Sequence, residues 1–131
     1  MKVMVVGEGE GELFFFCQAL KALGAELIHA ATLDEDKVVL HRVDMVVHRW
    51  SSFNADVQTV QIQNLKEADP NLVIVLFAPT QDVGAVRHRF PRELVADTRA
   101  LEAAHAERTA RAALQEARAR RGMPPVPVAA A

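Results

Sequence analysis

Cysteine and long apolar segments are scarce in this chain of 131 residues, and each scarcity excludes a class of protein. The single cysteine, Cys17, rules out an internal disulfide framework and a multi-cysteine metal site. The longest apolar run lies within residues 71–78, far short of the roughly 20 residues that a membrane-spanning helix needs. Residues 1–6 lead directly into an acidic, glycine-rich segment and lack the pattern of a secretion signal. We therefore expect a cytoplasmic protein that makes no contact with a membrane.

Lysine is missing from the last part of the chain, where arginine carries all of the positive charge. Residues 1–86 hold 12 acidic and 6 basic side chains, whereas residues 87–131 hold 9 arginines and 5 acidic side chains. The arginines could attract an acidic protein or a nucleic acid, or they could pair with neighbouring glutamates along a helix. The interspersed signs favour helix pairing, and the single aromatic residue near these arginines, Phe90, argues against nucleic-acid binding.

Strand and helix patterns alternate over the first 78 residues. Apolar runs predict strands, and apolar residues spaced three and four apart predict helices. The predicted strands are residues 3–6, 26–31, 43–48 and 71–78, and the predicted helices are residues 12–23, 33–42 and 54–68. In the last of these helices we place Val57, Val60, Asn64, Leu65 and Ala68 on the buried face. Such alternation predicts an α/β fold with a parallel sheet of four to five strands covered by helices on both faces.

The alternation becomes irregular after residue 78. Residues 85–90 could form a polar edge strand or only a connection, and Pro91 suits the first turn of a helix. From there to Arg121 the composition is dominated by strong helix formers. We therefore divide the chain into an α/β domain over residues 1–90, a long C-terminal helix over residues 91–121 that packs on the domain or projects from it, and a disordered tail over residues 122–131.

The order and spacing of these elements resemble the receiver domain of bacterial response regulators, a three-layer, flavodoxin-like fold. Receivers hold magnesium through two acids at the end of the first strand, where this chain has Gly7 and Glu8. Their phosphate-accepting aspartate ends the third strand, five residues after an aspartate that opens it. Here Asp44 opens the strand and Arg49 stands at the acceptor position. The architecture therefore resembles the family, whereas the acceptor chemistry does not.

Two further positions depart from the receiver pattern. The Ser or Thr that ends the fourth strand is replaced by Phe77 or Ala78, and the fifth-strand lysine, which precedes a proline, would fall at Phe90. The resemblance thus implies a pseudo-receiver: a non-catalytic regulatory or protein-interaction module without cofactor or metal. Arg49 would either pair with Glu8 across the top of the sheet or point into solvent.

A glycine-rich loop offers an alternative function. Gly7–Gly11 follows a strand and opens a helix, which is where nucleotide-binding α/β folds place phosphate. The spacing is G-x-G-x-G, and Glu8, Glu10 and Glu12 would bring negative charge against a phosphate. A small-molecule or nucleotide-binding domain that uses this loop is therefore the second hypothesis.

Surplus aromatic residues predict a protein interface. Phe14 and Phe15 lie off the core face of the first predicted helix, where the C-terminal helix or a partner subunit could cover them. Trp50 and Phe53 follow the third strand, where they could form a binding surface or anchor the loop by burial. With Arg108 and Arg111 of the C-terminal helix, these residues form the candidate interface for a protein partner or for a homodimer.

Reactive groups are few. Cys17 falls on the inward face of its helix and is expected to be a core thiol. His48, at the end of the third strand, is the only candidate acid–base group, and the sequence offers no partner for it. We expect no enzymatic activity.

Overall fold

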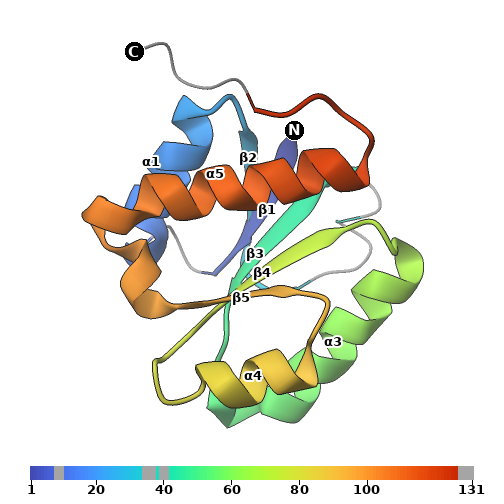
Figure 1. The fold of residues 1–131 in the computed structure, drawn as a ribbon. Coiled ribbons are helices and arrows are strands. Elements are labelled where there is room, and N and C mark those ends of the chain that lie inside the picture. Colours follow the sequence, from blue (N-terminus) through green and yellow to red (C-terminus); the bar gives the residue numbers. More distant parts are fainter. Residues whose placement is uncertain (8–10, 34–37, 39–41, 127–131) are drawn as a thin grey trace.

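A five-stranded parallel sheet forms the centre of the protein (Figure 1). The structure is a computed structural model, and it describes residues 1–7, 11–33, 38 and 42–126. The strands run in the order β2-β1-β3-β4-β5. Their bounds are β1 (Lys2–Val6), β2 (Glu26–Ala30), β3 (Met45–Arg49), β4 (Val73–Ala78) and β5 (Leu94–Asp97). Every residue of β4 is buried, as its uninterrupted apolar sequence predicts for a central parallel strand.

Helices cover both faces of the sheet, so the fold has three layers. The elements are η1 (Gly11–Leu13), α1 (Phe14–Ala22), η2 (Ser52–Asn54), α3 (Ala55–Ala68), α4 (Val83–Arg89), η3 (Thr98–Leu101) and α5 (Ala103–Arg120). Figure 1 shows α1 and α5 side by side on one face, and α3 and α4 on the other. The helix predicted over residues 33–42 lies mostly outside the described residues. No described helix is both long and apolar enough to cross a membrane.

The core between the sheet and the α1–α5 layer combines large and small side chains. Phe16 of α1 packs edge-on against Phe77 of β4, with ring centroids 4.9 Å apart, and both rings are fully buried. The inward face of α5 is made mainly of alanine: Ala106, Ala110, Ala113, Leu114 and Ala117 are buried. Cys17 is fully buried beside Phe16, which confirms its place in the core.

Two predictions for the C-terminal part are wrong. Residues 85–90 are neither a strand nor a simple connection, because residues 85–89 belong to helix α4. The last helix begins at Ala103 instead of residue 91, because Leu94–Asp97 pairs with β4 as the fifth strand. α5 lies against α1 and the sheet and does not project.

The tail folds back onto α5 as far as Val126, where disorder was predicted. The side chain of Gln115 accepts a hydrogen bond from the Val126 N–H at 2.9 Å and donates one to the Val126 carbonyl at 3.3 Å. The Val126 side chain is buried in the α1–α5 core. Val126 is stable in this position because its side chain is buried and both of its backbone groups are hydrogen-bonded. The proline-rich composition of the tail does not indicate this contact.

The buried face of α3 also differs from the prediction. Leu65 is buried as predicted, together with Gln58 and Ile62, whereas Val57 and Val60 are 60% and 55% exposed. Asn64 and Ala68 are also exposed. Gln58 is turned inward because its amide bonds to the loop before α3, as described below. The helix therefore carries an apolar strip on its solvent side.

The end of α5 is tied to the amino-terminal edge of the sheet through one guanidinium. Arg121 bonds both carboxylate oxygens of Asp69, and its Nε donates to Asp44 Oδ1 at 3.2 Å. The Arg121 hydrogen bonds hold the pKa of the Asp69 carboxyl below its usual value. Asp44 in turn accepts the backbone N–H of Lys2 at 3.1 Å. One side chain thus joins the end of α5, the residue after α3 and the start of β3.

Candidate functional site

The carboxyl edge of the sheet is where the receiver resemblance places a pocket. Gly7 follows β1 with φ of 141°, a conformation that favours glycine, and its N–H donates to the Ala30 carbonyl at 2.8 Å. Glu8 lies outside the described residues, so its predicted pairing with Arg49 stays a prediction. Of the loop Gly7–Gly11, only the two end glycines are described. The nucleotide hypothesis for this loop therefore also stays a prediction.

Arg49 is the last residue of β3, at the edge where the phosphate acceptor of receivers stands. Its guanidinium forms an ion pair with the Glu12 carboxylate of η1 at 3.0 Å, and both side chains are about half exposed. An exposed pair of this kind contributes at most about 1 kcal/mol to stability. The pair also holds the positively charged guanidinium of Arg49 at this end of the sheet.

Phe77 does not line a pocket at this edge, although the resemblance placed it there. Its ring is fully buried against Phe16 beneath α1, and only its backbone carbonyl serves the edge, by accepting the Trp50 N–H at 2.8 Å. Ala78, which ends β4, is also buried. The fourth strand therefore offers no hydroxyl here.

The end of the fifth strand is occupied by Asp97, whereas the sequence placed this position at Phe90. Asp97 pairs in register with Ala78. Its carboxylate accepts the Arg99 N–H at 2.9 Å, and this bond lowers the pKa of Asp97 together with a hydrogen bond from Thr80. Phe90 lies before the strand and is buried against Trp50, with ring centroids 5.5 Å apart.

A buried amide organises the loop between β3 and α3. Gln58 Oε1 accepts the Ser51 N–H at 3.1 Å, and Gln58 Nε2 donates to the Ser51 carbonyl, so the orientation of the amide is determined. The same Oε1 lies 2.8 Å from His48 Nε2. Because an amide oxygen only accepts, His48 must carry its proton on Nε2. Burial lowers the pKa of His48. Burial therefore favours the neutral imidazole, and the Gln58 contact fixes the orientation of the His48 ring near the end of β3.

The aromatic residues after β3 have opposite roles. Trp50 is buried, with Phe90 edge-on to its ring and the Arg89 guanidinium 5.7 Å from its centroid. Its burial anchors the loop, which is one of the two roles expected from the sequence; its part in an interface stays a prediction. Phe53, three residues later, is 96% exposed and stays available to a partner.

Phe14 and Phe15 form the second exposed aromatic surface. They are 46% and 50% exposed, and their rings pack edge-on with centroids 5.5 Å apart. α5 packs beside α1 without covering them, and a groove of about 380 Å³ lies next to them. We call it the Phe14–Phe15 groove; it is lined by Gly11, Glu12, Phe14, Phe15, Thr98, Arg99, Leu101 and Glu102.

Three arginines of α5 lie beside acidic or imidazole groups of the same helix, whereas Arg118 donates to the Pro124 carbonyl at 3.0 Å. Arg111 lies 3.3 Å from Glu107, and Arg120 lies 3.0 Å from Glu116. Arg108 is exposed and approaches His105 Nδ1 at 3.4 Å. These contacts agree with the interpretation that the arginines serve the helix itself.

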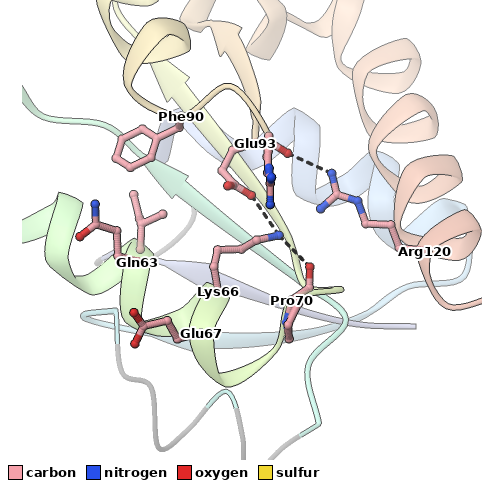
Figure 2. Close-up of a pocket in the computed structure, with 9 residues that line it drawn as sticks. Gln63, Lys66, Glu67, Pro70, Phe90, Glu93 and Arg120 are labelled. Carbon is pink, nitrogen blue, oxygen red and sulfur yellow. Dashed lines mark hydrogen bonds and ion pairs between the residues drawn. The ribbon is translucent and has the colours of Figure 1, made fainter.

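A cavity of about 540 Å³ lies between the end of α3, the α4–β5 connection and the end of α5 (Figure 2). Lys66 and Glu93 point toward one another in it at 3.3 Å, and Lys66 also donates to the carbonyls of Pro70 and Leu72 at 3.1 and 2.8 Å. Arg120 donates to the Arg92 carbonyl at 3.0 Å. The sequence does not predict this cluster, because its residues come from three separate elements and no spacing pattern links them. The charged side chains of this cluster connect α3, the α4–β5 connection and α5, so the cluster has a structural role.

The described residues contain no group of three or more side chains that could hold a metal ion. The searches by sequence returned neither a matching family model nor a matching curated protein. Solved structures do match. One is a CheY-like protein (tadZ) from Pseudomonas aeruginosa PAO1, with a TM-score of 0.66 and 18% identity over 86% of this chain and 92% of that chain. Another is a response regulator receiver domain protein from Clostridium thermocellum, with a TM-score of 0.50 and 15% identity over 83% of this chain and 92% of that chain. The fold predicted from the sequence is confirmed: it is the fold of receiver domains.

Proposed function

We propose that this chain is a receiver-like regulatory module that acts through protein–protein contacts and accepts no phosphoryl group at the end of β3. The observation that carries the proposal is Arg49 at that position, bonded to Glu12 at 3.0 Å. Transfer of a phosphoryl group to a receiver requires a carboxylate nucleophile beside a magnesium ion. A guanidinium supplies no nucleophile and repels the metal.

The neighbouring strand ends support the same proposal. Gly7 ends the first strand segment without a carboxylate, and Ala78 ends β4 without a hydroxyl. Asp97, at the end of β5, carries negative charge where the family has a lysine. The groups that would hold metal and phosphate are thus replaced at each of these described positions.

Interaction with another protein is the function that the remaining surface supports. The side chains of Phe14, Phe15 and Phe53 expose large apolar areas to solvent. Monomeric proteins usually expose only small apolar patches. A module that has the receiver fold but lacks the phosphate-accepting residues would transmit a signal by binding another protein.

Intact-mass spectrometry after incubation with acetyl phosphate and magnesium tests the proposal. We expect no mass increase, whereas a receiver domain that retains its aspartate, run in parallel, should gain one phosphoryl group. A phosphoryl group on this chain that hydroxylamine removes would indicate an acyl phosphate and would overturn the proposal.

A further inference from the structure

We propose that the Phe14–Phe15 groove binds a second copy of this chain, across a twofold axis that passes near the two rings. The inference rests on the proposed function, because it names the partner of an interaction module. The lining residues place the groove where the start of α1 meets the junction of η3 with α5. Figure 1 shows these segments at one end of the α1–α5 layer.

The centre of the groove is apolar and large enough for the middle of an interface. A phenylalanine buries on the order of 150–250 Å², so two rings that are 46% and 50% exposed leave about 150–250 Å² per copy. Two copies facing each other would therefore contribute about 300–500 Å² of the 1,200–2,000 Å² that specific interfaces bury. The rest must come from the other groove residues and their surroundings.

The rim of the groove carries opposite charges, which favours a second copy over an unrelated partner. Arg99 and Glu102 both line it, and neither forms an ion pair with another described residue. Glu12, the remaining acid of the rim, is paired with Arg49. A twofold contact requires a patch that complements itself. In the twofold contact that we propose, Arg99 of each copy lies opposite Glu102 of the other.

The walls of the groove are held in place before any partner arrives. Asp97 accepts the Arg99 N–H at 2.9 Å, and the Glu102 N–H donates to the Arg99 carbonyl at 3.1 Å. Leu101, between the two charged residues, is buried in the α1–α5 core. A preformed surface loses little conformational entropy on binding.

Sedimentation equilibrium of the full chain, over a concentration series up to about 1 mM, tests the inference. We expect the wild-type chain to form a dimer. Phe15→Gln should weaken the dimer at least about ten-fold, whereas Phe53→Gln, at an exposed ring of η2, should leave it unchanged. Circular dichroism of each variant establishes that the fold is retained.

Charge reversal tests the geometry. Arg99→Glu and Glu102→Arg should each weaken the homodimer about ten-fold, because both rim contacts become repulsive. An equimolar mixture of the two variants should form a heterodimer of wild-type affinity, since both contacts are then attractive. This rescue in trans requires the twofold arrangement, and a general loss of stability would not produce it.

Three results would overturn the inference: a wild-type monomer throughout the series, loss of the dimer in Phe53→Gln, or a mixture of charge variants that stays as weak as each variant alone. Each of these rejects the second copy as the occupant and leaves the phosphorylation test untouched. A phosphorylated chain that still dimerises through the groove would reject the proposed function and keep the interface.

Discussion

Replacing Arg121 by alanine tests whether the end of α5 holds the amino-terminal edge of the sheet together. The change removes the two-point contact with Asp69, the bond to Asp44 and a long bond to the Val43 carbonyl at 3.4 Å. These side chains are 23–28% exposed, so their interaction is stronger than that of exposed pairs and weaker than that of fully buried ones. Exposed pairs contribute about 0.2–1 kcal/mol, and breaking buried ones costs about 3–5 kcal/mol. We therefore expect Arg121→Ala to lower the free energy of unfolding by about 2 kcal/mol at neutral pH.

The effect should depend on pH in a defined direction. Arg121 lowers the pKa of Asp69 in the folded state, so the wild-type chain gains stability above the usual carboxyl pKa of about 3.9. That gain is lost as the pH falls through the lowered pKa of the folded state. The difference between the wild-type chain and Arg121→Ala should therefore be complete at pH 7 and should shrink below about pH 4.

Urea unfolding followed by tryptophan fluorescence measures both quantities, because the chain has one tryptophan and it is buried. Arg108→Ala, at an exposed arginine of the same helix, is the matched control and should change stability by less than about 0.5 kcal/mol. The reasoning fails if Arg121→Ala and Arg108→Ala unfold alike at pH 7. It also fails if the gap at pH 3 equals the gap at pH 7.

Three further predictions concern buried side chains. Phe77→Ala should destabilise the fold by about 3–5 kcal/mol in urea unfolding, whereas Phe53→Ala should have almost no effect; equal effects would contradict the assignment of core and surface. Burial lowers the pKa of His48, so wild-type stability should fall as the pH drops below about 6.5, and His48→Gln should flatten that part of the stability curve; an NMR titration with a pKa at or above 6.5 would refute this. Lys66→Met leaves the buried Glu93 carboxylate without its ion-pair partner and should cost about 3 kcal/mol, more than Glu93→Gln; the reverse order would show that the pair is not what stabilises this region.

The sheet was predictable from the sequence wherever a strand is long and apolar. Residues 71–78 predicted β4 because a strand buried on both faces leaves an uninterrupted apolar run. The fifth strand was missed because Leu94–Asp97 has only four residues and precedes a long segment of helix formers. Its strand conformation comes from pairing with β4, and pairing between distant segments leaves no periodic signal.

The candidate site was predictable in position and less so in orientation. The spacing from Asp44 placed Arg49 at the end of β3, where the structure has it. The direction of Phe77 was not predictable, because both faces of a central strand are apolar. The inward face of α3 was misassigned because valines suggested burial, whereas the amide of Gln58 is needed inside to bond Ser51 and His48.

The packing of α5 on α1 also has a consequence for how the chain folds during translation. Residues 103–120 complete the burial of the inner face of α1. They are synthesised about 80 residues after α1, which takes about 4–16 s at 5–20 residues per second. During that interval α1 lacks the helix that packs beside it in the folded chain, so the nascent chain exposes an apolar surface. Chaperone binding during translation should therefore concentrate on the α1 segment and end once α5 has emerged.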